Sequence, residues 1–365
     1  MNHPRSLYIH IPFCAHVCGY CDFVKAVYHK DLADQVLQRI AEDLKQFADP
    51  FDTIYIGGGT PSALDQDQLT LLESLLMPLI TSNTEYTMEI NPETIDLQKL
   101  STIREMKVNR LSVGVQAIQD NLLSVLTRKH TWQQAVDAIA MMRSLGFDNI
   151  SIDAMYGIPT QTTDDFAETL NAFIRLDVEH ISLYALTIEP NTAFARQNIQ
   201  PVDNDLEGSF YDLAHRMLTS NGYNHYEVSS YAKRNRKSRH NLAYWHYDDF
   251  IGIGPGAASK IGVVRTINTS NIHYYLSKQK LLKEKIILNK EESMFEFLMM
   301  NLRLSEGVNI QKFKEAFDVD LLEKYHHAIE AATQKGWLIV DFDTITTTYQ
   351  GRLFLHDVLV LLMDQ

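Results

Sequence analysis

The stretch SLYIHIPFCAHVCGYCDF, residues 6–23, joins an apolar run to a loop that holds every cysteine of the 365-residue chain. Cys14, Cys18 and Cys21 follow one another as C-x3-C-x2-C inside eight residues. Three unrelated buried thiols would not gather in this way. In a reducing compartment such a cluster more often binds a metal than forms a disulfide, so the loop is a candidate metal site.

Two kinds of metal site fit these cysteines. A zinc site needs a fourth ligand, which His10 or His16 could supply, although structural zinc sites usually pair two short hooks across a longer loop. An iron–sulfur cluster normally takes four thiolates, so three of them leave one iron free to bind another ligand. The odd cysteine count favours the iron–sulfur cluster, and zinc remains the alternative.

Apolar runs alternate with helical patterns from residue 6 to about residue 232. Apolar residues at steps of three and four between positions 32 and 47 mark the buried stripe of one helix. Strands that alternate with helices predict a parallel sheet covered by helices. The seven predicted strands are residues 6–11, 53–56, 86–90, 110–115, 149–155, 180–186 and 225–230.

Glycines, prolines and isolated polar residues follow one predicted strand after another, as in GGGTPS (57–62), NPE (91–93) and YGIP (156–159). A parallel barrel gathers such loops around one axis, whereas an open doubly wound sheet concentrates them at one switch point. The pattern therefore predicts an α/β fold, a partial TIM-like parallel barrel. The string GIGPGA (252–257) lacks the βαβ context of a dinucleotide fingerprint, and we interpret it as a tight turn.

The pattern changes near residue 285, which predicts a core domain, 1–285, and a C-terminal domain, 286–365. In the latter we expect helices at 293–304, 321–338 and 351–363 and a hairpin at 338–349, the order of a small winged-helix-like α+β module. Residues 291–365 hold 6 Lys and Arg against 13 Asp and Glu. This acidic balance favours a packing or lid role over DNA binding.

The bulk composition narrows the function further. A formal net charge of -13 argues against nucleic acid as a partner, because binding a phosphate backbone needs concentrated Lys and Arg. No apolar run approaches the ~20 residues that a membrane span needs. The N-terminus lacks the charged, apolar and small-residue order of a signal peptide, so we expect a cytoplasmic protein.

The stretch YIHIPFCAHVCGYCDF, residues 8–23, resembles the cluster loop of the radical S-adenosylmethionine (SAM) superfamily. It is most similar to the branch that contains the oxygen-independent coproporphyrinogen III oxidases and the HemW-type heme chaperones, and the resemblance covers essentially the whole chain. It implies a 4Fe–4S cluster on Cys14, Cys18 and Cys21, SAM on the fourth iron, and a HemN-like C-terminal domain. In such proteins the cofactor carries the chemistry and the protein orients it.

The resemblance also assigns SAM contacts, most of them to residues near strand ends. Taken alone, Glu89 or Asp153 could equally be a solvated loop carboxylate, and the repeated placement at strand ends is what favours binding. The implied SAM-binding residues are Tyr8, Tyr20, Gly58, Gly59, Thr60, Glu89, Gln116, Arg128, Asp153, Ala185 and Ala258.

Two features separate the chain from the oxidases. Those enzymes carry a further cysteine two residues after the third, where this chain has Phe23. The segment RHNLAYW, residues 239–245, fits the H-N-x-x-Y-W signature that is associated with heme binding in HemW-type proteins. His240 could ligate heme iron while Tyr244 and Trp245 lie against the macrocycle. The alternative is that His240 only packs in a polar corner of the barrel rim.

The resemblance thus predicts a heme chaperone that binds a cluster, SAM and heme and transfers heme to an acceptor protein. The acceptor, which could be membrane-associated, and the electron donor for the cluster are not identified by the sequence. The alternatives are an oxygen-independent coproporphyrinogen III oxidase, which performs an oxidative decarboxylation, and a zinc-binding interaction module. The basic segment 233–240 is expected to receive heme propionates or an acidic acceptor surface, unless it is only a solvated loop.

Overall fold

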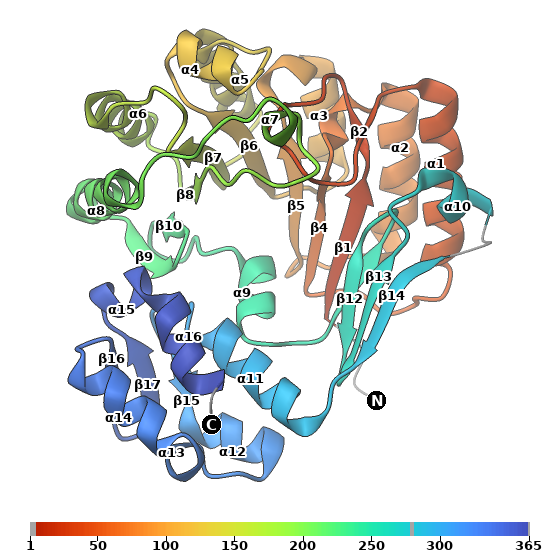
Figure 1. Cartoon of the computed structure of the whole chain (residues 1–365). Helices are drawn as coiled ribbons and strands as arrows, with labels where there is room; N and C mark the ends of the chain where they lie inside the picture. Colours follow the sequence, from red (N-terminus) through yellow and green to blue (C-terminus); the bar gives the residue numbers. More distant parts are fainter. Residues whose placement is uncertain (1–4, 278–280, 364–365) are drawn as a thin grey trace.

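The computed structural model describes residues 5–277 and 281–363 and divides them into a large sheet domain and a small C-terminal domain (Figure 1). In the large domain, helices lie along one face of a long sheet. The C-terminal domain, drawn in blue, lies below the sheet in Figure 1. No helix among the described residues combines the length and the apolar character that crossing a bilayer requires.

Six of the predicted strands form the middle of the sheet, with boundaries within two residues of those expected. They pair in parallel and in chain order. Each carries apolar side chains that are buried on the helix-covered face, which is why short apolar runs identified them. They are β1 (Ser6–Ile11), β4 (Thr53–Gly58), β5 (Glu85–Ile90), β6 (Arg110–Gln116), β7 (Ile150–Tyr156) and β8 (His180–Ala185).

The prediction of a seventh strand of the parallel sheet at residues 225–230 is wrong. Residues 225–230 form parts of two short antiparallel strands, β9 (Asn224–Glu227) and β10 (Ser230–Ala232), and β10 pairs antiparallel to β8. The parallel neighbour on the far side of β1 is β11 (Phe250–Ile253). Sequence reasoning missed β11 because it is four residues long and contains Gly252, at which a Cβ would lie 2.0 Å from the carbonyl oxygen of Ala258.

Three further antiparallel strands follow β11, namely β12 (Ala258–Ile261), β13 (Val264–Asn268) and β14 (Leu282–Ile287). The order of the 12 strands is β14-β13-β12-β11-β1-β4-β5-β6-β7-β8-β10-β9. Among the described residues the two edge strands, β14 and β9, do not pair with each other, so the sheet remains an incomplete barrel.

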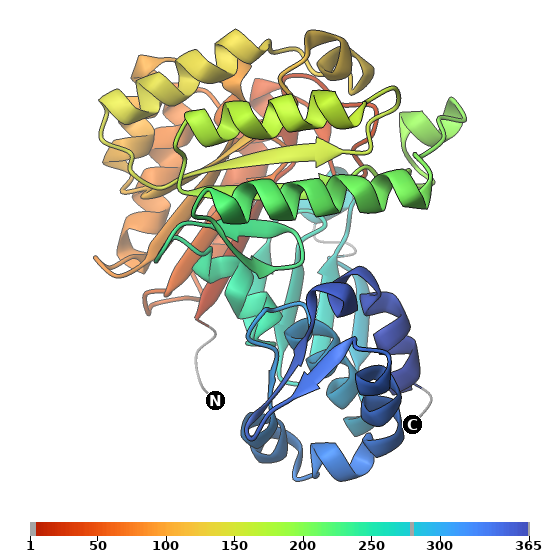
Figure 2. The same ribbon diagram turned by 90° about the vertical axis from the view of Figure 1, so that its left-hand side faces the viewer.

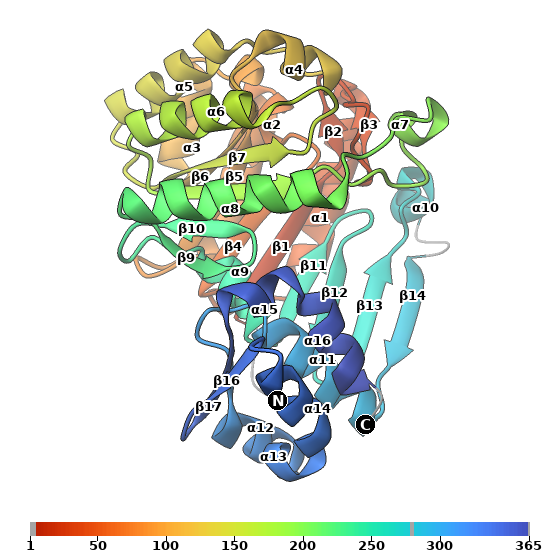
Figure 3. The ribbon, with the colours of Figure 1, turned by 60° about the vertical axis from the view of Figure 1, so that its left-hand side comes forward.

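Six helices in the first two thirds of the chain cover one face of the parallel strands, and a seventh, α4 (Asp120–Val125), packs in a separate apolar cluster (Figures 2 and 3). Three of them begin with capping boxes, at Asp65, Thr131 and Thr162, in which the side chains of the first and fourth residues satisfy each other's backbone amides. The helices are α1 (Lys30–Leu44), α2 (Gln66–Leu76), α3 (Leu97–Glu105), α4 (Asp120–Val125), α5 (Trp132–Ser144), α6 (Thr163–Arg175) and α8 (Asn204–Ser220).

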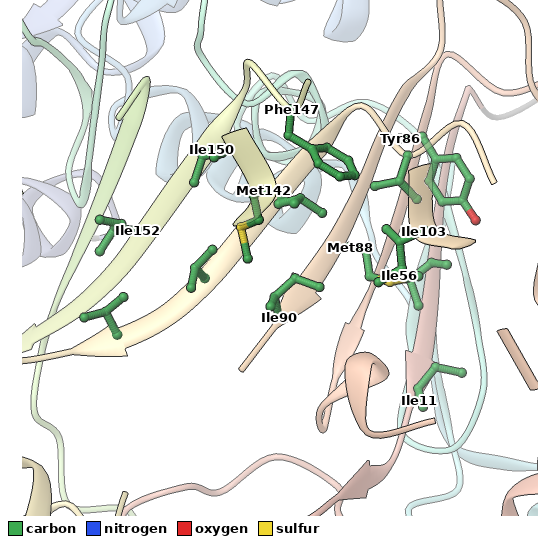
Figure 4. Close-up of a cluster of buried hydrophobic side chains, with 14 of the residues drawn as sticks. Ile11, Ile56, Tyr86, Met88, Ile90, Ile103, Met142, Phe147, Ile150 and Ile152 are labelled. Atoms are coloured by element: carbon green, nitrogen blue, oxygen red, sulfur yellow. The ribbon is translucent and has the colours of Figure 1, made fainter. Parts of the chain in front are cut away.

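The main hydrophobic core fills the layer between these helices and the sheet (Figure 4). Strand residues such as Ile56 and Ile152 and helix residues such as Ile103 and Met142 are all 0% exposed. Burying one such side chain contributes about 1.5–3 kcal/mol. The core therefore fixes the strands rigidly, and with them the loops at their C-terminal ends.

Short elements complete the large domain. The strands β2 (Phe13–Cys14) and β3 (Ala26–Val27) pair in parallel and enclose the cysteine loop. The remaining elements are the 3-10 turns η1 (Pro61–Ala63), η2 (Met77–Leu79) and η3 (Pro92–Thr94) and the helices α7 (Ala193–Arg196), α9 (Arg239–Trp245) and α10 (Ile272–Ser277).

The C-terminal domain is an α+β unit with a separate hydrophobic core that begins at Met294. The hairpin expected at 338–349 is confirmed, and a third short strand extends it in the order β15-β17-β16. The predicted boundary between residues 285 and 286 lies within β14. The elements are α11 (Lys290–Asn301), β15 (Val308–Asn309), α12 (Ile310–Phe317), α13 (Leu321–Lys324), α14 (His326–Gln334), β16 (Leu338–Val340), β17 (Thr344–Thr347), α15 (Tyr349–Leu353) and α16 (Leu355–Met363).

Candidate functional site

A cavity of about 360 Å³ lies at the C-terminal ends of the parallel strands. This is the end at which parallel α/β folds bind their ligands, because the loops after the strands converge there. The cysteine loop covers the cavity. Of the residues predicted to bind the cluster or SAM, the structure places twelve in its lining: Cys14, Cys18, Cys21, Tyr20, Gly58, Gly59, Thr60, Glu89, Gln116, Arg128, Asp153 and Ala185.

Two predicted SAM contacts are not in that lining. Tyr8 lies below it on β1, with its hydroxyl 3.0 Å from Nδ1 of His10 and its ring 6.1 Å from the Tyr55 ring. Ala258 is exposed on β12, where its carbonyl oxygen closes over Gly252. Direct contact with SAM remains a prediction for both residues.

The three cysteines are free thiols at the end of β2 and in the loop that follows. Burial raises the pKa of Cys14 to about 11 and also raises the pKa of Cys21. A buried thiolate needs a compensating positive charge, which bound iron supplies. The donor chemistry of the loop therefore fits a metal centre.

The cysteine loop is held in place by contacts with distant segments. The backbone N–H of Gly19 donates to Oγ1 of Thr127 at 2.7 Å. A Cβ at Gly19 would lie 2.7 Å from the Phe194 ring, so only glycine fits there. The Lys25 ammonium donates to the carbonyl oxygen of Cys21. These contacts preorganise the loop before any cofactor binds.

The glycines after β4 let backbone form the floor of the cavity. Gly58 has a φ of 105°, and a Cβ there would lie 2.4 Å from the His10 imidazole. A Cβ at Gly59 would lie 2.7 Å from the carbonyl oxygen of Ile11. The amide of Thr60 donates to the carbonyl oxygen of Phe13 at 2.7 Å, which ties this turn to the cysteine loop.

Two half-buried carboxyl groups face the cavity from neighbouring parts of the sheet. Glu89 accepts hydrogen bonds from the Tyr55 hydroxyl at 2.9 Å and from the Gly58 amide at 3.0 Å. Asp153 accepts one from the Ser112 hydroxyl at 2.8 Å. Burial raises the pKa of Glu89 to about 7 and raises that of Asp153. Such carboxyl groups suit a ligand that presents a cation and several hydroxyl donors.

Arg128 brings a half-buried positive charge to the same cavity. Its Nη2 donates to the carbonyl oxygen of Gly114 at 2.6 Å and to Oδ1 of Asn91 at 2.9 Å, and its Nη1 lies 3.7 Å from the sulfur of Cys18. Its Nε is buried and has no hydrogen-bond partner among the described residues. An unpaired guanidinium nitrogen fits a ligand carboxylate.

Gln116 reaches the cavity through an irregular end of β6. It has a φ of 69°, a conformation that non-glycine residues seldom adopt, and the pairing with β7 shifts register between Gly114 and Gln116. Such bulges redirect side chains beside functional sites.

Several cavity residues were missed by the sequence reasoning. One signal in the sequence could have identified them, namely their position on a predicted parallel strand or just after it. The missed residues are Tyr55, Asn91, Ser112, Met155, Tyr184 and Thr187.

The segment RHNLAYW forms α9, which packs under the opposite end of the sheet. The His240 side chain is buried, with Nδ1 2.7 Å from Oγ1 of Thr53 and Nε2 2.8 Å from the Tyr244 hydroxyl. The Glu85 carboxylate accepts the backbone N–H groups of both Arg239 and His240. Both ring nitrogens of His240 are thus engaged. Ligation of heme iron by His240 remains a prediction, and it would require breaking one of these bonds.

The other two residues predicted to contact heme are also packed. The Tyr244 hydroxyl is hydrogen-bonded to Nε2 of His240. The Trp245 ring lies under the guanidinium of Arg303, 4.7 Å from it. In the basic segment, Lys233 pairs with Asp177 and Arg236 pairs with Asp148, so two of its cations already have acidic partners.

Comparison with known families and proteins adds to this geometry. The family description "Radical SAM superfamily" matches residues 8–173, and "HemN C-terminal domain" matches residues 288–354. The first range includes the cysteine loop and β4 to β7. The second lies within the C-terminal domain.

Curated relatives match over nearly the whole chain. The heme chaperone HemW of Escherichia coli is 34% identical over 99% of this chain and 99% of its own length. The heme chaperone HemW of Bacillus subtilis is 32% identical over 97% of this chain and 98% of its own. Among solved structures, the coproporphyrinogen III oxidase HemN of E. coli superimposes with a TM-score of 0.85, 23% identity, and coverage of 98% of this chain and 90% of that one. This last likeness confirms the fold.

Proposed function

The chain belongs to the HemW family within the radical SAM superfamily, and on this premise we propose that it binds heme and delivers it to an acceptor protein. Membership of the superfamily makes it a protein that binds a 4Fe–4S cluster and SAM. The curated relatives that cover its full length are named heme chaperones. The proposal extends their named function to this chain.

The residues of the cavity fit the two cofactors. Cys14, Cys18 and Cys21 would hold three irons of the cluster and leave the fourth for SAM. When bound, the cluster supplies one-electron chemistry. Glu89 would accept hydrogen bonds from the cationic or hydroxyl groups of SAM, and the free Nε of Arg128 would donate to its carboxylate.

The observation that favours a chaperone over an oxidase is Phe23. The oxidases of this branch have a cysteine at this place, but here a phenyl ring, 64% exposed, lines the mouth of the cavity. A phenyl ring can neither ligate iron nor transfer a proton. The second candidate, oxidative decarboxylation of coproporphyrinogen, is supported by the fold shared with HemN.

One experiment separates the two functions. The protein is reconstituted with iron and sulfide without oxygen, titrated with hemin, and assayed in the same sample for decarboxylation of coproporphyrinogen III with SAM and a one-electron reductant present. We expect saturable heme binding, transfer to an apo-heme protein, and no decarboxylation. Turnover of coproporphyrinogen, or the absence of heme binding, would contradict the proposal.

The proposal includes two partners, an electron donor for the cluster and a heme acceptor that could lie at a membrane. The reduced thiols that a cluster requires support a cytoplasmic location. The net charge of -13 supports protein and heme partners over nucleic acid.

A further inference from the structure

Two cavities meet at His246, directly after α9, at the end of the sheet opposite to the cysteine loop. One, of about 430 Å³, lies among the end of α9, the turn between β12 and β13, α11 and α12. The other, of about 510 Å³, lies between the starts of β1 and β4 and the outer face of α9. His246 lines both. Figure 1 shows α9 between the lower ends of these strands and α11, at the junction of the two domains.

The walls of the first cavity suit a flat and largely apolar ligand, and its polar lining includes the Asp248 carboxylate as well as two lysines. Phe297 and Phe317 supply aromatic surface, and Val263 and Ala316 supply aliphatic surface. Cavities of 300–1,000 Å³ at domain junctions, lined by apolar groups and a few polar ones, are typical ligand sites. Heme presents a large apolar macrocycle, two propionates and an iron that takes an axial imidazole.

His246 can provide that imidazole in its observed position. Its side chain is 32% exposed, and its Nε2 lies 2.6 Å from Oε1 of Glu306. Among the described residues its Nδ1 has no hydrogen-bond partner. When Nε2 carries the proton and donates it to the carboxylate, Nδ1 has a free lone pair. A carboxylate behind a metal-binding histidine fixes the tautomer and makes the ligand more basic.

His240 contrasts with His246 in each of these respects. Its side chain is 1% exposed, and both ring nitrogens are hydrogen-bonded inside the protein. Ligation by His240 would require α9 to leave the sheet, because Glu85 holds the first turn of that helix through two backbone amides. His246 needs no such rearrangement.

A cation for a propionate is present on the same cavity. Lys312, at the start of α12, is exposed, and its ammonium makes no hydrogen bond or ion pair in the described part of the chain, although it interacts electrostatically with Asp248 of the same cavity. Lys260 lines the cavity too, but its ammonium is already bound to the carbonyl oxygen of Tyr247 at 2.8 Å and to Asp249 at 2.9 Å. Lys312 is therefore the cation that can receive an incoming carboxylate.

We propose that heme binds in this groove between α9, α11 and α12, with His246 as the axial iron ligand and Lys312 beside a propionate. This inference rests on the proposed heme-carrier function and gives it a location. It places heme at the junction of the two domains, far from the cluster cavity. The RHNLAYW segment then acts by positioning His246, through the bonds that fix α9.

The test is a hemin titration of the cluster-loaded protein, followed by the Soret band and by electron paramagnetic resonance of the ferric heme. We expect His246→Ala to weaken heme binding at least tenfold and to change the Soret maximum and the spin state. His240→Ala should keep the wild-type spectrum, and so should the control His273→Ala, which alters an exposed histidine on α10. Ala316→Trp, at an exposed position, should weaken binding by filling the groove while His246 is intact.

A second variant tests the carboxylate behind the ligand. Glu306→Gln should retain heme and raise its reduction potential, because the imidazole becomes less basic. Cluster content and SAM binding of every variant report whether it folds. If the wild type binds heme and His246→Ala binds it equally with an unchanged spectrum, this inference is wrong and the carrier function stands. If the wild type binds no heme, the proposed function itself fails.

Discussion

The two ends of the parallel sheet place their polar groups in different surroundings. At the C-terminal end, Glu89, Asp153 and Arg128 face a cavity, and the guanidinium Nε of Arg128 has no partner among the described residues. At the N-terminal end, Glu85 and His240 are hydrogen-bonded to other parts of the protein. Polar groups that face a cavity can form further hydrogen bonds with a ligand, whereas polar groups enclosed by the protein hold its elements together.

The largest effect is expected where cofactor binding depends on a side chain that nothing else can replace. Cys18→Ser should abolish the cluster, because a hydroxyl is a poor ligand for iron. Iron and sulfide per chain and the visible absorption measure this loss. His16→Ala, in the same cavity, should leave the cluster intact. A zinc content that depends on His16, without iron, would instead support the zinc alternative.

The next effect concerns the carboxyl groups of the cavity. Glu89→Gln should weaken SAM binding about 10- to 100-fold, because a charge-assisted hydrogen bond contributes about 1.5–3 kcal/mol. Calorimetric titration of SAM into the cluster-loaded protein measures it. Tyr55→Phe removes only the neutral donor that orients Glu89, and we expect about a fivefold loss from it. Unchanged affinity in both variants would remove Glu89 from the SAM site.

At the N-terminal end of the sheet, we expect a substitution to change the stability of the fold and not the affinity for SAM. Glu85→Gln should lower the free energy of unfolding by about 1–3 kcal/mol, because the variant weakens the acceptor of two buried backbone amides at the start of α9. Urea denaturation measures this change. SAM affinity should not change. A loss of SAM affinity with no loss of stability would contradict the assignment of ligand binding to one end of the sheet and of stability to the other.

The smallest effect is a pH dependence of stability at the same end. Burial, with the Arg110 cation nearby, lowers the pKa of His240 to about 3. The unfolded chain therefore takes up a proton below about pH 6.5 that the folded chain does not. This histidine should cost about 1.4 kcal/mol of stability per pH unit as the pH falls below 6.5. His240→Asn should be less stable at pH 7 but should show a shallower slope in urea denaturation between pH 5 and pH 7. An identical slope would contradict the prediction.

The comparison also explains which sequence predictions succeeded. The six central strands and the loops after them were predictable because a buried parallel strand leaves a local apolar run, and glycine or polar residues must follow it. Residues such as Glu89 and Asp153 were found through this pattern together with the family resemblance. β11 and the hairpin of β9 and β10 were not, because four-residue strands leave too little periodicity to separate them from loops.

The sequence by itself determined the cysteine loop, six of the parallel strands and the end of the sheet at which the cofactor residues gather. The tertiary structure decided which histidine is available. His240 belongs to the recognisable signature, but its Nδ1 is bound to Thr53, which is 187 residues away along the chain. His246 lies outside that signature, and it lines two cavities, one of which forms where the two domains meet. Local patterns encode which elements form, whereas the partners and exposure of a side chain depend on segments that meet only in the folded chain.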